Sequence, residues 1–207
     1  MAPRLWKTRL FTATSLDGSI ARKNNDILWL TSPALNPAHI APSSPGTKQT
    51  PTFEQHISGI DFIVMGRVTF EVCCNMTDWP YPKDKNLLVL SSTLDTESIS
   101  SLTSNSTLDT KPRIVSSLDE VEMILRGEDA KWVYADRGET VRGFLSRGWV
   151  DEMVLTFAHI LLGNMGGPGR SLFSSFGFHL EEDVKFTLLG VDVIEGGMAS
   201  CYYRVLR

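Results

Sequence analysis

Cysteine is scarce in this sequence, and its pattern excludes a disulfide-stapled scaffold. The 207 residues include three cysteines, Cys73, Cys74 and Cys201. They form no C-x-x-C pair and no even set of the kind that a small secreted disulfide framework requires. We interpret them as reduced thiols, because free cysteine behaves as a small apolar residue in protein cores.

Long apolar runs and a strong charge of one sign are also missing. No stretch approaches the roughly 18 apolar residues that a membrane helix needs, and the N-terminus has no run of signal-peptide length. A net charge of -4 gives no general attraction for nucleic acid or anionic lipid. We therefore expect a cytoplasmic protein whose partner is a small molecule, with no nucleic acid and no membrane partner.

Histidine is equally sparse, which argues against a metal centre. The four histidines, His39, His56, His159 and His179, are scattered along the chain, and each is read as a structural or surface residue. No serine lies in a G-x-S-x-G elbow, so the commonest hydrolase chemistry is not expected either.

The sequence does contain strand-like segments that alternate with helix-like segments over a length typical of one domain. Strands are predicted at 7–14, 61–65, 87–90, 113–115, 131–135, 153–162, 184–194 and 198–206, and helices at 67–73, 118–125 and 141–148. Ser117 and Glu120 have the spacing of a capping box before the second helix. This alternation predicts an α/β fold in three α/β/α layers, with a mixed, mostly parallel central sheet.

Two further segments complete the expected organisation. Glu195-Gly196-Gly197 has the composition of a hairpin turn between the last two strands, which would add antiparallel strands at one sheet edge. Residues 32–52 contain five prolines among serines and threonines, too broken for regular structure. We interpret them as a surface insertion within a single domain spanning residues 1–207.

Three strand ends carry candidate phosphate sites. They are Gly66-Arg67-Val68-Thr69, Ser91-Ser92-Thr93 and Asp136-Arg137-Gly138-Glu139-Thr140. A glycine before a helix lets backbone amides and the positive helix end approach a phosphate, and arginine and hydroxyl groups add donors. Each segment alone is more commonly a plain turn. Together, on one rim of a parallel sheet, they predict a dinucleotide crevice.

Taken in order, these segments resemble the dihydrofolate-reductase-like superfamily, and most closely the reductase domain of riboflavin biosynthesis. The resemblance spans most of the chain and rests on residues 15–21, 65–71, 90–93, 148–152, 161–163 and 172–173. It implies a reductase that uses NADPH and passes a hydride to a pyrimidine, a pterin or a similar small ring. A riboflavin-pathway-like ribosylaminopyrimidine ranks above dihydrofolate, because the motifs match that branch more closely.

The resemblance also implies which residues contact the cofactor. Near the nicotinamide and the substrate it places Ala13, Ser15, Leu16, Gly18 and Ile20. For the cofactor phosphates it implies Gly66, Arg67 and Thr69, and for the adenosine 2′-phosphate Ser91, Ser92 and Thr93. Against the pyrophosphate and the nicotinamide it implies Asp136, Arg137, Gly138, Glu139 and Thr140.

Asp17 is the carboxylate that the resemblance places beside the pocket, and it is therefore the candidate catalytic residue. A turn-forming role with Gly18 competes with acid catalysis. Because the hydride comes from the cofactor, the protein mainly has to position a carbon acceptor and stabilise developing charge.

Arg137 departs from the family pattern, which has a glycine pair where this chain has Arg137 and Gly138. A residue with a Cβ resists the backbone geometry of a glycine, so we expect the arginine either to shift the loop or to point outward. This departure keeps an alternative function open, a non-catalytic ligand-binding or interaction protein that retains the fold but binds the cofactor weakly.

Two expectations about assembly follow from the same resemblance. The H-x-E and P-C-x-x-C patterns of a zinc deaminase are missing from the sequence, so the deaminase domain that often precedes this reductase is not expected. Relatives commonly dimerise through the strand matching 153–162 and the closing hairpin, so a homodimer is expected.

Overall fold

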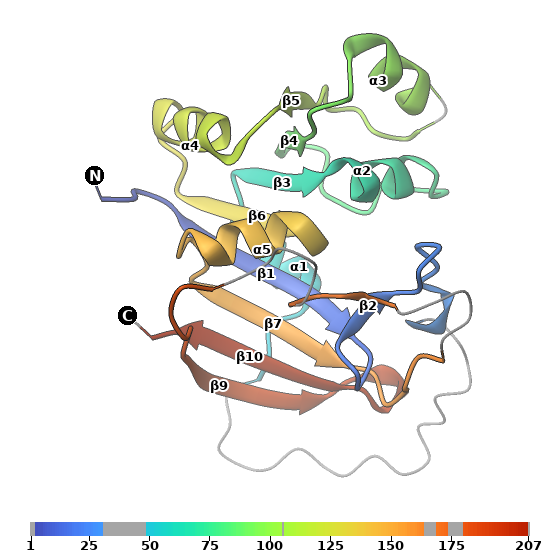
Figure 1. Ribbon diagram of the computed structural model, residues 1–207, viewed down its shortest axis with the longest axis vertical. Coiled ribbons are helices and arrows are strands. Elements are labelled where there is room, and N and C mark those ends of the chain that lie inside the picture. The colour runs from blue at the N-terminus through green and yellow to red at the C-terminus, as the bar shows by residue number, and fades with distance from the viewer. Residues whose placement is uncertain (1–2, 31–48, 105, 164–168, 174–179, 207) are drawn as a thin grey trace.

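The computed structural model describes residues 3–30, 49–104, 106–163, 169–173 and 180–206. An eight-stranded sheet crosses the molecule in the order β5-β4-β3-β6-β1-β7-β10-β9, from the top to the bottom of Figure 1. Its strands are β1 (Lys7–Thr14), β3 (Phe62–Gly66), β4 (Asn86–Leu90), β5 (Arg113–Val115), β6 (Trp132–Asp136), β7 (Glu152–Phe157), β9 (Phe186–Val193) and β10 (Ala199–Val205).

The sheet is mostly parallel, as the alternation of strands and helices predicted. All neighbours from β5 to β7 pair in parallel. β10 then pairs antiparallel with both β7 and β9. The predicted closing hairpin is confirmed, and a short turn at Glu195–Gly197 connects its strands. Gly196 and Gly197 have φ of 81° and 78° in this turn, a left-handed conformation that glycine adopts at little cost.

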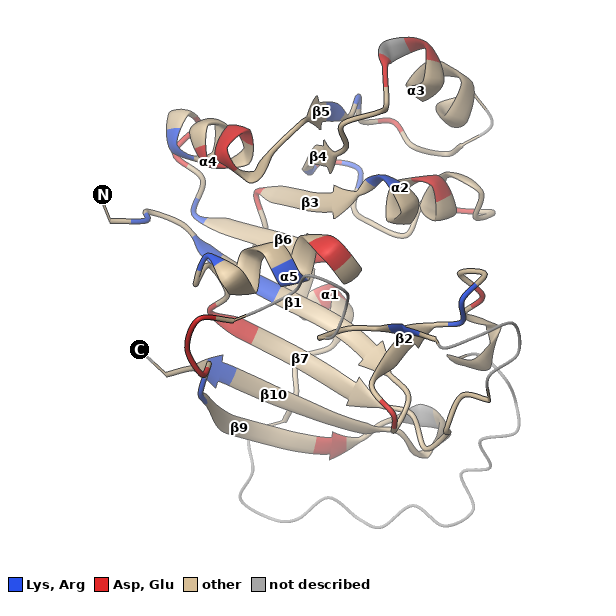
Figure 2. Ribbon diagram, viewed as in Figure 1, with Lys and Arg blue, Asp and Glu red and all other residues tan. Residues whose placement is uncertain are grey.

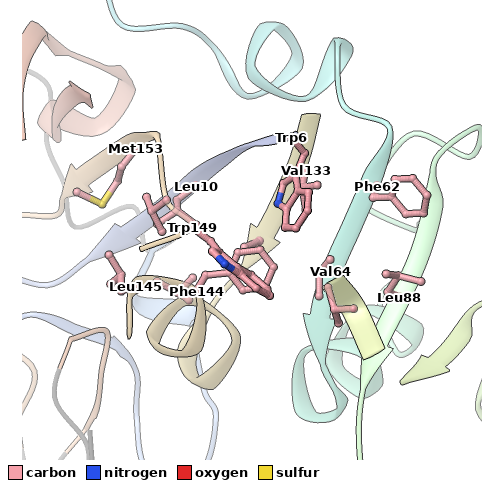
Figure 3. Close-up of a cluster of buried hydrophobic side chains, with 14 of the residues drawn as sticks. Trp6, Leu10, Phe62, Val64, Leu88, Val133, Phe144, Leu145, Trp149 and Met153 are labelled. Atoms are coloured by element: carbon pink, nitrogen blue, oxygen red, sulfur yellow. The ribbon is translucent and has the colours of Figure 1, made fainter. Parts of the chain in front are cut away.

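Helices cover both faces of the sheet. They are α1 (Phe53–Ser58), α2 (Arg67–Cys74), α3 (Thr96–Thr103), α4 (Leu118–Gly127) and α5 (Gly138–Ser146). Alternate side chains of β3 supply the two cores: Phe62 and Val64 pack with α4 and α5, whereas Ile63 and Met65 pack with α1 and α2. Figure 3 shows the first core, in which Trp6, Phe144 and Trp149 meet. The two cores make this a three-layer arrangement.

Several element boundaries differ from the sequence-based expectation. The strand predicted at 153–162 ends at Phe157, because its partner β1 ends at Thr14 and the ladder has no further strand to bond. Ser117 caps α4 as predicted, but the Glu120 carboxylate accepts hydrogen bonds from Ser116 N and Oγ at 2.7 and 3.0 Å instead of closing a capping box. Helices α1 and α3 were not predicted. In the case of α3 the reason is that serine and threonine dominate the helix and its surroundings.

Part of the expected organisation lies outside the described residues. This applies to positions 32–48 of the proline-rich insertion, while residues 49–52 lead directly into α1. Within the described part of the chain, no helix has the length and apolar character that crossing a membrane requires.

Candidate active site

The carboxyl ends of β3 and β6 open onto a cavity of about 450 Å³. Its walls come from the first turns of α2 and α5 and from a small two-stranded sheet, β2 (Ser19–Ala21) with β8 (Arg170–Ser171). This first cavity is lined by Ile20, Ala21, Asn25, Ile27, Gly66, Arg67, Val68, Thr69, Val72, Leu90, Arg137, Gly138, Glu139, Thr140, Arg142, Gly169, Arg170 and Ser171. Two of the three predicted phosphate segments therefore lie together on one rim.

Two helix N-termini border this cavity. α2 begins after Gly66 and α5 after Arg137, and no described side chain caps either helix start. The first N–H groups of a helix have no intrahelical partner, and the positive end of the helix dipole lies with them. Two such ends beside one cavity make it suited to an anion.

Thr140 supplies an unpaired hydroxyl between the two helix starts. Its Oγ1 atom is buried and has no hydrogen-bond partner among the described residues. A Cβ added to Gly66 would lie 3.5 Å from this oxygen, so the two segments are close together. A buried hydroxyl without a partner costs about 1–3 kcal/mol, which a hydrogen bond to a bound ligand would offset.

Basic side chains gather at the same rim. Figure 2 shows basic colour where β3 passes into α2, the position of Arg67. Arg67 lies 3.6 Å from Glu71, and both side chains are partly exposed. Arg142 is buried, pairs with Glu139, and donates from Nη1 to the backbone oxygens of Ser171 and Leu172 at 2.8 and 3.2 Å. Arg142 thus ties the chain around β8 to α5 beside the cavity.

A second cavity of about 280 Å³ lies next to the first. It is lined by Phe11, Thr12, Ala13, Ile20, Leu30, Phe53, Cys73, Met76, Pro80, Tyr81, Tyr134 and Arg137. Phe53 lies 5.4 Å from Phe11 and 6.1 Å from Tyr81 between ring centroids. Ile20 and Arg137 line both cavities and so mark the boundary between them.

A buried carboxylate lies behind that boundary. Asp136 is 1% exposed, and the Tyr81 hydroxyl donates to its Oδ2 at 2.5 Å. The Tyr134 hydroxyl lies 3.4 Å from Oδ1 and donates at 2.8 Å to the Phe11 carbonyl. Burial raises the pKa of Asp136, while Arg137 and the two tyrosine hydroxyls oppose that rise. Burial also raises the pKa of the nearby Cys73 thiol to about 12.

Arg137 adopts a third arrangement besides the two that were expected. Its backbone has φ 51° and ψ 157°, a region that is almost exclusive to glycine. The side chain is 35% exposed and turns toward Asp136, with Nε 3.7 Å from Oδ1. The arginine thus has a backbone conformation typical of glycine and forms an ion pair with its buried neighbour.

The predicted residues at the end of β1 divide between the second cavity and a turn. Ala13 and Ile20 line the cavity. Ser15 hydrogen-bonds the Ser19 backbone, Gly18 has φ 76°, and Leu16 is 58% exposed, so these three build the turn and line neither cavity.

Asp17 belongs to the same turn. Its carboxylate accepts from Leu162 N at 3.0 Å and from Ser19 Oγ at 2.8 Å. The Leu162 hydrogen bond is the main cause that lowers the pKa of Asp17. Asp17 lines neither cavity, and its contacts favour the turn-forming role over acid catalysis.

The hydroxyl cluster Ser91-Ser92-Thr93 lies at the edge of the site. The Ser91 Oγ atom accepts from Thr93 N at 3.2 Å and from Leu94 N at 3.0 Å, which forms a local turn. None of the three residues lines the first cavity, but Leu90 does, and it pairs with Gly66 across β3 and β4. The cluster therefore begins at the residue directly after Leu90, which belongs to the cavity wall.

Sequence reasoning missed the residues that reach the cavities from distant segments. Arg142 and Ser171 join the first cavity, and Tyr81 and Phe53 join the second. Arg142 carried a detectable signal, since a charged residue on the apolar face of α5 needs a buried partner. The aromatic residues carried none beyond their apolar character.

The chain has clear relatives among known proteins. Residues 7–200 match the family model of the RibD C-terminal domain. No curated protein matches the chain significantly. A crystal structure described as a riboflavin biosynthesis protein, from Shewanella sp. PV-4, aligns with 97% of this chain and 99% of its own, at 30% identity and a TM-score of 0.71.

Two more distant structures share the fold. A pyrimidine reductase-like protein from Corynebacterium diphtheriae aligns with 99% of this chain and 93% of its own, at 16% identity and a TM-score of 0.60. RibD from Acinetobacter baumannii also has 16% identity and a TM-score of 0.60, and it covers 100% of this chain. This chain spans 59% of that longer protein.

Proposed function

The chain belongs to the RibD C-terminal domain family, with a dihydrofolate-reductase-like fold, and from this premise we propose that it is an NADPH-dependent reductase. Its acceptor is a small heterocyclic ring of the pyrimidine or pterin type. The observation that carries the proposal is the buried Thr140 hydroxyl, which has no hydrogen-bond partner among the described residues and lies between two helix starts without a described side-chain cap.

The residues of the first cavity fit a dinucleotide. The α2 and α5 N-termini and the Thr140 hydroxyl would hold the pyrophosphate, because together they offer donors to phosphate oxygens. Arg67 and the Ser91-Ser92-Thr93 cluster would hold an adenosine 2′-phosphate, since both follow paired ends of β3 and β4. The positive charge of Arg67 beside a 2′-phosphate would favour NADPH over NADH. Bound NADPH would supply the hydride.

The protein itself would position the cofactor and the acceptor and partly enclose them. Ile20 and Arg137 stand where the two cavities meet, so the acceptor would approach the cofactor across this boundary. β8 pairs with β2 at the rim of the first cavity, and Arg142 holds the chain around β8 to α5. Holding two reactants in a shared, partly enclosed space is the main service a protein provides when the cofactor carries the chemistry.

Titration of the purified protein with NADPH, followed by nicotinamide fluorescence, tests the proposal. We expect saturable binding that is tighter for NADPH than for NADH. Loss of NADPH absorbance on adding reducible pyrimidines or pterins would then identify the acceptor. Binding of neither dinucleotide would overturn the assignment as a reductase.

A second candidate function rests on Arg137. A non-catalytic protein that retains the fold but binds the cofactor weakly is favoured by an arginine where the family pattern has glycine, held in an ion pair with Asp136. This alternative predicts ligand binding without NADPH oxidation. The intact helix starts and the Thr140 hydroxyl favour the reductase.

We also propose that the protein is a cytoplasmic homodimer. β9 is the edge strand of the sheet, and its Leu188 side chain is 51% exposed. An unpaired edge with exposed apolar residues favours self-association. Light scattering at roughly tens of micromolar protein should give the mass of a dimer. The mass of a monomer would contradict the proposed dimer.

A further inference from the structure

The ion pair of Asp136 and Arg137 lies beside the two helix starts of the first cavity. Asp136 is paired with Met65 across β6 and β3. The next residues on these strands, Arg137 and Gly66, are the N-caps of α5 and α2. We propose that the pair is a proton-linked switch, in which bound dinucleotide phosphates attract Arg137 away from Asp136, and the Asp136 carboxylate takes up a proton from solvent. The inference rests on the proposed function and assigns the regulation of that site.

Among the described residues of the first cavity, three arginines pair with carboxylates, and these carboxylates differ in burial. Arg67 pairs with Glu71, and Arg142 pairs with Glu139. The side chains of Glu71 and Glu139 are 34% and 79% exposed, whereas that of Asp136 is 1% exposed. A solvent-exposed carboxylate stays hydrated and charged when its arginine turns to a ligand. Exchange at the two exposed pairs therefore involves no proton.

The buried carboxylate of Asp136 behaves differently. The Tyr81 hydroxyl donates to it, and the Tyr134 hydroxyl lies 3.4 Å away, but both groups are uncharged. A buried carboxylate that loses its cation is neutralised by a proton, because an isolated charge in an apolar interior is costly. A phosphate at the start of α5 adds to this cost, since like charges repel more strongly in a low dielectric. Movement of Arg137 to a phosphate therefore requires protonation of Asp136.

Arg137 is placed to exchange its partner with little movement. Its side chain lines both cavities and is 35% exposed. The distance of 3.7 Å between Nε and the Asp136 Oδ1 atom exceeds the length of a hydrogen bond. A phosphate could accept two parallel N–H bonds from the planar guanidinium, which is a stronger interaction. The exchange thus favours the arginine, and its cost falls on the carboxylate.

The other ionisable groups around Asp136 keep one charge state near neutral pH. The groups are Arg137, Tyr81, Tyr134 and Cys73, with His56 next to Tyr134. Burial raises the pKa values of both tyrosines and raises that of the thiol to about 12. Burial also lowers the pKa of the histidine to about 4, and the arginine remains a cation. Between about pH 5.5 and 8, Asp136 is therefore the group of this cluster whose charge ligand binding changes.

Proton uptake gives the cofactor affinity a defined dependence on pH. Burial already raises the pKa of Asp136 in the free protein. Binding raises this pKa further, because a cation leaves the carboxylate and an anion approaches it. Between the pKa values of the free and the bound protein, affinity should rise as the pH falls, by up to about tenfold per pH unit. Outside that interval the contribution of Asp136 to the pH dependence disappears.

Calorimetric titration with NADPH in two buffers of different ionisation enthalpy counts the protons that binding takes up. The titrations cover about pH 5.5 to 8, the range in which Asp136 is expected to change its charge. The 2′-phosphate of NADPH itself titrates near pH 6, so each count is compared with that of Asp136→Asn. We expect the wild type to take up more protons than this variant, by as much as about one per dinucleotide. Equal counts at every pH would overturn the proposal.

Asp136→Asn also mimics the protonated acid. At about pH 7.5 it should bind NADPH roughly tenfold more tightly than the wild type, because Arg137 is free to contact a phosphate. This advantage should shrink in acid. Glu139→Gln is the matched control, since Glu139 is the exposed partner of Arg142 at the same cavity. It should keep the proton count of the wild type, and a lost count in this control would contradict the role of Asp136.

Tyr81→Phe provides an independent variant. It removes the hydroxyl that donates to Asp136, which raises the pKa of that carboxylate and should move proton uptake to higher pH. Circular dichroism verifies the folding of each variant. If Asp136→Asn does not fold, the upward shift in Tyr81→Phe decides, and an unshifted proton uptake would then overturn the proposal.

A second probe separates this inference from the proposed function. Inorganic pyrophosphate has the phosphates of a dinucleotide without the nicotinamide. NADPH binding with equal proton counts in the wild type and Asp136→Asn overturns the inference alone. A wild-type excess of protons with pyrophosphate, without any NADPH binding, supports the switch and overturns the reductase. Binding of neither probe overturns both.

Discussion

The Nε atom of Arg137 lies 3.7 Å from Oδ1 of Asp136, so neighbouring residues at the end of β6 form an ion pair between a buried and a half-buried side chain. The arginine reaches this position from a backbone with φ 51°. Arg137 therefore has a strained backbone and at the same time compensates the charge of Asp136. Asp136 needs a cation because it is buried, and Arg137 provides one at the cost of an unfavourable backbone.

This coupling predicts the stability of Arg137→Gly. Glycine relieves backbone strain of about 1–3 kcal/mol, but the change leaves the buried Asp136 unpaired, which costs about 3–5 kcal/mol when a pair is fully buried. Since Arg137 is 35% exposed, solvent weakens its pairing, and we expect a net loss of about 1–2 kcal/mol in the free energy of unfolding. Urea unfolding measures it.

The double variant Asp136→Asn with Arg137→Gly provides the control for that prediction. Without a carboxylate at 136, removal of the arginine leaves no buried charge, so the double variant should be more stable than Arg137→Gly alone. A single Arg137→Gly variant that is more stable than the wild type would show that strain outweighs the ion pair.

Thr140→Val separates binding from stability. Valine has nearly the shape of threonine and removes a buried hydroxyl that has no partner among the described residues. The free energy of unfolding without ligand should stay the same or rise, while NADPH affinity falls by about 0.5–1.5 kcal/mol, or two- to tenfold. Fluorescence titration and urea unfolding measure the two effects.

Thr156→Val is the matched control for Thr140→Val. The Thr156 hydroxyl is buried and lies 3.3 Å from Ser200 Oγ, within hydrogen-bond distance, and Thr156 lines neither cavity. This variant should lose stability and keep its NADPH affinity. A Thr140→Val variant that loses stability and keeps its NADPH affinity would mean that Thr140 does not contact the cofactor.

Arg67→Ala tests the position of the cofactor phosphates. A guanidinium that reaches the adenosine 2′-phosphate contributes about 1.5–3 kcal/mol, so NADPH should weaken while NADH does not. Equal weakening of both would place Arg67 at the pyrophosphate. Stability should change little, because the Arg67–Glu71 pair is partly exposed. If neither affinity changes, Arg67 is a structural residue.

His56 predicts a loss of stability in acid. Burial, with the charge of Arg9 adding to it, lowers the pKa of this histidine from 6.5 to about 4. Between these two pH values His56 therefore binds a proton in the unfolded chain but not in the folded protein. The contribution of His56 is complete above about pH 6.5 and is lost as the pH falls toward 4, by up to about 3 kcal/mol.

His56→Gln removes this titration and serves as the comparison. Urea unfolding at about pH 7.5 and about pH 4.5 should show a steeper loss of stability in the wild type than in the variant. His56 packs against Phe11 and Tyr134, with ring centroids 5.6 and 6.5 Å away. The variant is therefore expected to be less stable than the wild type at both pH values. Equal slopes would mean that His56 titrates normally when folded.

Local sequence pattern predicted most strands and the starts of α2 and α4. The apolar run of β3 ends at Gly66 and passes directly into α2, a change that neighbouring residues determine by themselves. The helix cap at Ser117 and the glycine turn at 195–197 are local in the same sense. Helix α3 escaped prediction because its serines and threonines have no apolar period.

The sequence by itself determined the positions of most strands, the glycine and arginine positions and the family resemblance, because backbone propensity and short motifs depend on adjacent residues. Only the tertiary structure decided which of those residues share a cavity. Tyr81 reaches Asp136 and Arg142 reaches Ser171 across long stretches of chain. The order of strands in the sheet sets these contacts, and it follows from the packing of both cores together, which no local pattern encodes.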